Sequence, residues 1–134
     1  MRHHAVWVSN YDRGTLLRIP VEEDGSAGTI RTHATGLTGI DDFAFAGHGK
    51  TVLAALNNTD SELALVRPDG THTVVLTGKD GLSGPTSVAV RHHRVYVPGA
   101  AFLTGVDPNL LVADVGKNEK SEPGKNGKHW KHED

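Results

Sequence analysis

The stretch Val52-Leu53-Ala54-Ala55-Leu56-Asn57 has a counterpart on each side of it in the chain. Val6-Trp7-Val8-Ser9-Asn10 begins 46 residues earlier, and Val95-Tyr96-Val97-Pro98-Gly99 begins 43 residues later. A repeat of about 45 residues is typical of a propeller blade, which is built from four short antiparallel strands. The spacing therefore predicts successive blades.

The segments between these three also recur in phase. Residues 40–45 (IDDFAF) are repeated 45 positions later by residues 85–90 (PTSVAV), which predicts an inner strand for two blades. Further strands are expected in matching positions, at 16–19, 63–66 and 110–113 and at 29–32 and 73–76. We therefore expect an all-β chain that forms a partial β-propeller of about two and a half to three four-stranded antiparallel blades.

The blade count predicts an incomplete ring. One complete blade is expected over residues 40–76, with a partial blade on either side. Because propellers close with typically 4–8 blades, the chain resembles the C-terminal half of a larger propeller. We assign residues 1–115 to this partial propeller. Residues 116–128 hold no large apolar residue, so we expect 116–134 to be a disordered polar tail.

Composition excludes several classes of function. Lys and Arg number 14 against 16 Asp and Glu, so the chain lacks the basic balance of a nucleic-acid-binding protein. Cysteine is absent, which rules out disulfides and thiolate zinc sites. No stretch approaches the roughly 18 apolar residues of a membrane helix. We expect neither nucleic acid nor a membrane among the partners.

The N-terminus is compatible with two cellular locations. Met1-Arg2-His3-His4 runs directly into the first expected strand, without a signal peptide. We expect a cytoplasmic protein if the chain begins at Met1 as written. It is secreted if Met1 is an internal start within a longer protein, which fits a first blade that begins at its second strand.

Two repeated segments carry a resemblance to a known family. Residues 36–45 (GLTGIDDFAF) and 81–90 (GLSGPTSVAV) resemble the Gly-Leu-x-x-Pro-Asp-Gly approach to an inner strand in six-bladed propellers of the gluconolactonase and senescence-marker-protein class. The resemblance covers roughly residues 5–115. It implies a divalent cation at the mouth of the central channel, held by carboxylate and amide oxygens, which are the ligands of calcium-like ions.

The resemblance also suggests site residues. Asp41 matches the Asp of the motif, and it would serve as a metal ligand and as the catalytic base. Thr86, a poorer ligand, takes that place in the next repeat. Asn10 and Asn57 end their strands and would add amide oxygens to the same ion.

Turn chemistry is the alternative for these and other polar pairs. Asp41-Asp42 begins a strand, and neighbouring strand residues point to opposite faces, so at most one of the two faces the channel. Asn57-Asn58 favours a turn after a strand. His92-His93 stands where a two-residue hairpin turn is expected, although histidines there would also bind metal or titrate near neutral pH.

Residues 44–51 (AFAGHGKT) offer a distant alternative, a nucleotide-binding protein. They fit a relaxed phosphate-loop pattern in which Lys50 reaches the phosphates and Thr51 the magnesium ion. The mechanism needs a helix to begin at this loop, because the amides of a helix N-terminus bind the phosphates. Residues 52–56 instead match two other expected strands.

The sequence thus predicts a ligand-binding or structural module that takes a small molecule and is not catalytically complete alone. The alternative is a metal-dependent lactone or ester hydrolase, once further blades complete the ring. Exposed apolar strands pair with other chains. We therefore expect either a homodimer or a complex with a missing N-terminal half-propeller.

Overall fold

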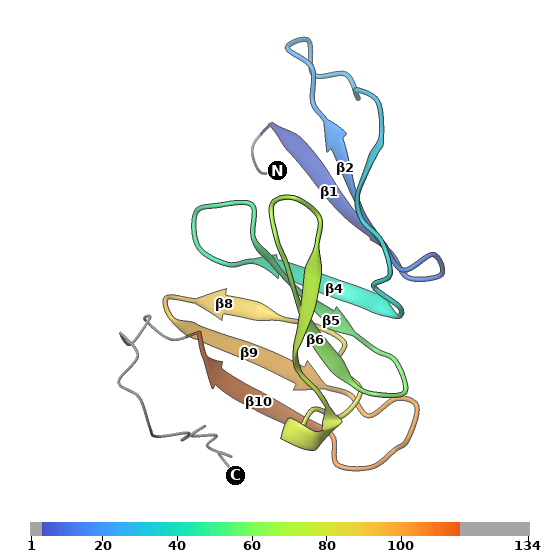
Figure 1. The fold of residues 1–134 in the computed structure, drawn as a ribbon, viewed down its shortest axis with the longest axis vertical. Coiled ribbons are helices and arrows are strands. Elements are labelled where there is room, and N and C mark those ends of the chain that lie inside the picture. The colour runs from blue at the N-terminus through green and yellow to red at the C-terminus, as the bar shows by residue number, and fades with distance from the viewer. Residues whose placement is uncertain (1–3, 116–134) are drawn as a thin grey trace.

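The computed structural model describes residues 4–115, and this part of the chain is all-β apart from one short 3-10 helix (Figure 1). The strands are β1 (Ala5–Asn10), β2 (Thr15–Pro20), β3 (Arg31–Ala34), β4 (Ile40–Phe45), β5 (Val52–Leu56), β6 (Glu62–Val66), β7 (His72–Leu76), β8 (Ala89–Arg91), β9 (Arg94–Gly99) and β10 (Asn109–Asp114), and the 3-10 helix is η1 (Gly78–Asp80). The expected disorder of 116–134 lies outside the described residues.

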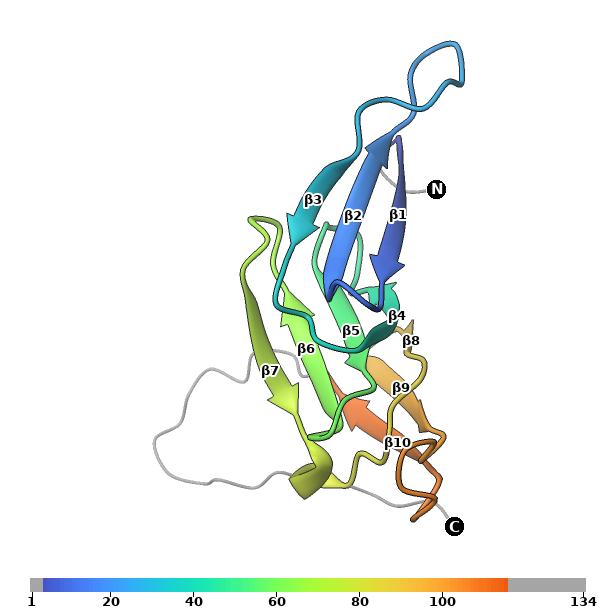
Figure 2. The same cartoon turned by 90° about the vertical axis from the view of Figure 1, so that its right-hand side faces the viewer.

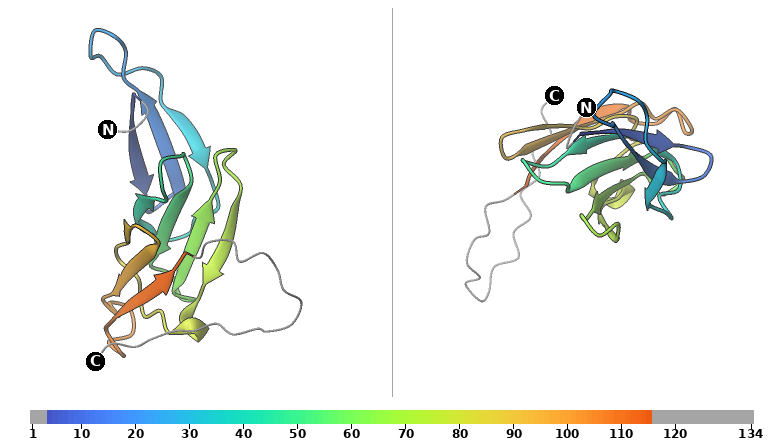
Figure 3. Two further views of the ribbon diagram at one scale, coloured as in Figure 1. Left: turned by 90° about the vertical axis from the view of Figure 1, so that its left-hand side faces the viewer. Right: turned by 90° about the horizontal axis from the view of Figure 1, so that it is seen from above.

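The strands form three antiparallel sheets that follow one another in sequence. The first sheet has the order β1-β2-β3, the second β4-β5-β6-β7 and the third β10-β9-β8. Figure 2 and Figure 3 show the sheets stacked along the long axis of the molecule. On one side, β4 contacts both β1 and β8, so the first strands of the three sheets share an inner edge. The predicted all-β partial propeller, with one four-stranded blade between two incomplete ones, is confirmed.

The central strand β5 is buried on both of its faces. Val52 and Ala54 belong to a core cluster shared with the first sheet, which includes Leu16. Leu53 and Ala55 belong to a second cluster, shared with the third sheet. Because successive side chains of a strand point to opposite faces, a strand between two sheets must be apolar at every position. The unbroken apolar run of β5 meets this requirement.

The two predicted inner strands have different outcomes. The strand at 40–45 forms as β4, in which Asp41 is exposed and residues 42–45 are half-buried, because β4 forms the edge of its sheet. We also expected a strand over residues 85–90. The regular strand is β8, and Pro85 makes only an isolated bridge to Gly99. Before β8, the Val88 N–H donates to the carboxylate of Asp42 in the second sheet and not to a neighbouring strand.

The repeated Gly-Leu-x-Gly segments have one structural role. Leu37 and Leu82 are buried, one in each core cluster. The second glycine of the first segment, Gly39, has a φ of 76° and its carbonyl accepts the N–H of Asn57 at 2.8 Å. In the second segment, the carbonyl of Gly84 accepts the N–H of Ala100 at 3.0 Å. Each segment therefore inserts a leucine into the core and ties the start of its sheet to the end of the next strand.

Replacing Gly39 with alanine is expected to destabilise the protein by about 2 kcal/mol or more, because a left-handed backbone is strained for alanine. The added Cβ would also lie 2.8 Å from the carbonyl oxygen of Asn57. Gly47→Ala is the matched control, since Gly47 has a φ of 72° but nothing within 4 Å of a Cβ. Urea unfolding measures both variants. If both variants lost the same free energy of unfolding, the close approach of Gly39 to Asn57 would not contribute to the loss.

Candidate ligand and metal sites

The adjacent carboxylates at the start of β4 have different surroundings. The carboxylate of Asp42 accepts hydrogen bonds from Ser87 Oγ at 2.6 Å and from the Val88 N–H at 3.4 Å, so it links the second sheet to the third. Asp41 is exposed, its main-chain oxygen accepts the Ser9 hydroxyl at 3.2 Å, and its carboxylate has no hydrogen-bond or ion-pair partner within residues 4–115. Among the described residues, the Asp41 carboxylate therefore remains available to a ligand, whereas Asp42 stabilises the fold.

The two predicted amide ligands also differ. The side-chain oxygen of Asn10 accepts the N–H of Arg13 at 3.1 Å, which is turn chemistry. Asn57 is 7% exposed, and its Oδ1 is buried without a hydrogen-bond partner within the described part of the chain. Its main-chain oxygen accepts the hydroxyl of Tyr11 at 3.2 Å. Of the two amides, Asn57 has the free oxygen.

The main-chain oxygens of Asp41 and Asn57 are bonded by residues on either side of Asn10, at one end of β1. Asn10 lies between Ser9 and Tyr11, which bond to Asp41 and Asn57 respectively. The turn interpretation applies to the residue after Asn57, because Asn58 Oδ1 accepts the N–H of Asp60 at 3.1 Å. Across residues 4–115, no three His, Cys, Asp or Glu side chains are grouped as metal ligands.

Ser87→Ala is expected to lower the free energy of unfolding by about 1–3 kcal/mol, because it leaves the half-buried carboxylate of Asp42 without its shortest hydrogen bond. Ser26→Ala is the matched control, since the Ser26 hydroxyl also bonds an aspartate, Asp24, at 2.6 Å but in an exposed turn. Thermal unfolding measures both. If Ser26→Ala lowered the free energy of unfolding as much as Ser87→Ala does, the hydrogen bond between the sheets would have no special role.

A second candidate site lies between the first and second sheets. It is a pocket of about 300 Å³. Its lining residues come from β1, β2, β3, the β4–β5 hairpin and the β6–β7 turn, namely Trp7, Arg18, Arg31, Thr32, His33, Lys50, Pro68 and Asp69. Trp7 is paired with Arg18 across β1 and β2, and Arg18 with Arg31 across β2 and β3. These three residues form a row across the first sheet.

The pocket is positively charged. Arg18, Arg31 and Lys50 form no ion pair with a carboxylate of the described residues. Asp69 is the one acidic residue in the lining. Hydrogen bonds from the Thr71 hydroxyl and N–H hold the pKa of Asp69 below its ordinary value, so this carboxylate is ionised at neutral pH. Three cationic groups therefore face one anion.

Two donors in the first-sheet row are unsatisfied. Arg18 Nε and Trp7 Nε1 are buried and have no hydrogen-bond partner within residues 4–115. The Trp7 ring is fixed by edge-to-face contacts, with centroids 4.7 Å from His33 and 5.3 Å from Phe45. Sequence reasoning missed this site because its residues lie on different strands. The only sequence signal was Lys50.

The phosphate-loop alternative is not supported by the local structure. The loop at 44–51 closes a hairpin, in which the Ala46 N–H donates to the carbonyl of Thr51 at 2.9 Å. It leads into the strand β5 and not into a helix. The helix amides that the mechanism needs are therefore missing from this place, although Lys50 lies in the charged pocket.

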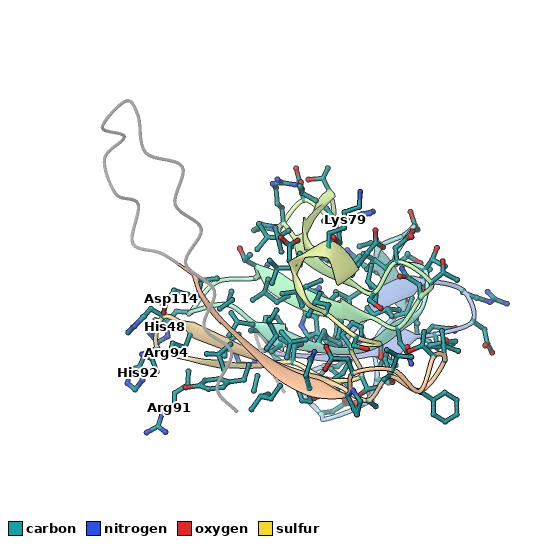
Figure 4. All side chains as sticks on the ribbon, turned by 90° about the horizontal axis from the view of Figure 1, so that it is seen from below. His48, Lys79, Arg91, His92, Arg94 and Asp114 are labelled. Carbon is teal, nitrogen blue, oxygen red and sulfur yellow. The ribbon has the colours of Figure 1, made fainter. Side chains whose placement is uncertain are left out.

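The paired histidines form a turn, as predicted. His92 and His93 connect β8 to β9, and His92 has a φ of 56°. Beside them is a hollow of about 240 Å³ lined by Arg91, His92, His93, Arg94 and Tyr96. Asp114 lies 3.6 Å from His93 Nε2 and 3.8 Å from Arg94 Nε, in exposed pairs of the kind that contribute little stability. Figure 4 shows His48 on the same side of the molecule as Arg91, His92, Arg94 and Asp114.

No protein-family model matches the chain, and no curated protein matches it. The resemblance to the gluconolactonase class therefore stays an expectation from the repeated motifs. The described residues include no helix that has the length and apolar character to cross a membrane.

Proposed function

We propose that the chain is a gluconolactonase-like propeller module that completes a ring with further blades and binds a small molecule at the inner edge marked by Asp41. In this proposal the isolated chain is a binding or structural unit and is not catalytically complete. The observation that carries it is an exposed apolar face on each terminal sheet, in the positions where neighbouring blades pack.

The exposed face of the first sheet is one of these. Val6 and Val8 are 43% and 37% exposed. They occupy the repeat positions of Val52 and Ala54, which face the preceding sheet in the second blade. In the first sheet the same positions have no preceding sheet among the described residues, so an apolar face is left open.

The third sheet has the complementary face. Leu110 is 54% exposed and pairs with Pro98 across β9 and β10. Leu110 occupies the repeat position of Leu63, which belongs to the cluster shared with the following sheet. Each chain thus carries one face that accepts a preceding sheet and one that accepts a following sheet.

A second copy of this chain is the partner that fits both faces. The first sheet of one copy would pack on the third sheet of the other, and the reverse contact would form at the same time. Two copies of three sheets give six blades, within the usual range for a closed propeller. A two-fold axis along the channel, the commonest symmetry of oligomers, would relate them.

We expect sedimentation equilibrium at micromolar concentration to show a dimer. Val8→Asp should dissociate it, because a carboxylate would be buried in the new interface without a partner. Val74→Asp is the matched control, since Val74 is 38% exposed, like Val8, but lies on the outer edge strand β7. A monodisperse, cooperatively unfolding monomer of the unchanged protein would contradict the dimer, as would equal dissociation by both variants.

A metal-dependent lactone or ester hydrolase is the second candidate function. It is favoured by the free carboxylate of Asp41 and by the unpartnered, buried oxygen of Asn57 at the same end of β1. Oxygen ligands of this kind suit a calcium-like divalent cation, which would polarise a substrate carbonyl. Asp41 would then activate water as a general base.

Calcium at millimolar concentration is expected to raise the melting temperature only slightly, because stabilisation by a ligand requires a tight site in the folded chain. The site here offers one free carboxylate and one free amide oxygen. A rise of many degrees that Asp41→Ala removes and Asp12→Ala retains would contradict this expectation and favour the hydrolase. Asp12 is exposed and lies on the β1–β2 turn.

A further inference from the structure

We propose that the pocket between the first and second sheets binds the phosphate group of a small phosphorylated molecule. This site involves neither Asp41 nor the open faces of the terminal sheets. The proposal therefore does not rest on the proposed ring function.

The first argument is the position of the two arginines. Arg18 and Arg31 are direct partners in the antiparallel pair β2–β3, so both project from the same face of the sheet. Directly opposed residues have Cβ atoms about 4.5–5.5 Å apart, and like charges in such positions destabilise a sheet. A bound anion between them would turn this repulsion into attraction.

The second argument is the absence of an internal counter-ion. Within residues 4–115 neither arginine forms an ion pair, and Arg18 Nε is a buried donor without an acceptor. A buried guanidinium donor without a partner is costly. The one carboxylate in the lining, Asp69, already accepts both the hydroxyl and the N–H of Thr71. The three cationic side chains of the pocket therefore outnumber its single carboxylate, and the pocket keeps a net positive charge.

The third argument is that cations approach from both sheets. Lys50 lies in the lining from the β4–β5 hairpin of the second sheet, opposite the arginines of the first. Guanidinium groups bind phosphate through paired N–H donors, and a lysine adds a point charge. Two arginines and a lysine suit a dianion better than a single carboxylate. The volume of about 300 Å³ leaves room for a small organic group beside the phosphate.

The test is an NMR titration of the whole chain with inorganic phosphate and with glucose 6-phosphate, with chloride matching the ionic strength and glucose as the uncharged comparison. We expect the indole N–H signal of Trp7 to shift with either phosphate compound and not with glucose or chloride. Tighter binding of the sugar phosphate would identify a phosphate monoester as the ligand. Equal or tighter binding of inorganic phosphate would identify the free ion.

Variants of Arg31 separate a built site from general surface charge. Arg31 is exposed, so Arg31→Gln should fold, and we expect it to weaken phosphate binding about tenfold. Arg31→Lys keeps the charge without the paired donors, so its affinity for phosphate should lie between the affinities of Arg31→Gln and of the unchanged chain. Arg91→Gln is the matched control, because Arg91 is an exposed strand arginine outside this pocket.

The unchanged chain should also gain thermal stability from phosphate, and Arg31→Gln should lose this gain. No shift of the Trp7 signal, a shift equally produced by chloride, or equal weakening by Arg31→Gln and Arg91→Gln would each overturn the proposal. None of these outcomes decides whether the dimer forms, which sedimentation measures separately.

Discussion

The two-sided burial of β5 is the interaction on which the rest of the structure depends. Val52 and Ala54 pack toward the first sheet, while Leu53 and Ala55 pack toward the third. The neighbouring sheets therefore have to lie face to face with the second one, and each must turn its own apolar side inward. Two residues of this strand are alanines, and their small side chains allow the neighbouring sheets to approach closely.

Stacking of repeated units also brings equivalent positions of the repeat into contact. Asp42 and Ser87 are 45 positions apart, and they hydrogen-bond to each other across the second and third sheets. Tyr11 and Asn57 are 46 positions apart, and they meet across the first and second. The Asp42 carboxylate thus has a side-chain partner in the next blade, whereas the Asp41 carboxylate beside it has none among the described residues.

The sequence predicted those features that depend on local periodicity. The phase of the repeated segments located every strand of the complete blade and the turn at His92-His93, because equivalent strands of successive blades recur at nearly constant spacing. It did not predict the shortened β8, which is preceded by a Val88 N–H that donates to the Asp42 carboxylate of the second sheet. The facing arginines were also missed. Arg18 and Arg31 are separated by a long connection, and the pairing of β2 with β3 shifts between Leu16 and Leu17, so their register depends on tertiary packing.

The pocket between the first two sheets takes one wall from each of them, so its width depends on the angle at which those sheets meet. Closing a ring fixes that angle, because all the angles between neighbouring sheets must add up to a full turn. An anion held by both walls acts on the same angle. Ring closure and anion binding would then be thermodynamically coupled, and each would change the equilibrium of the other by the same factor.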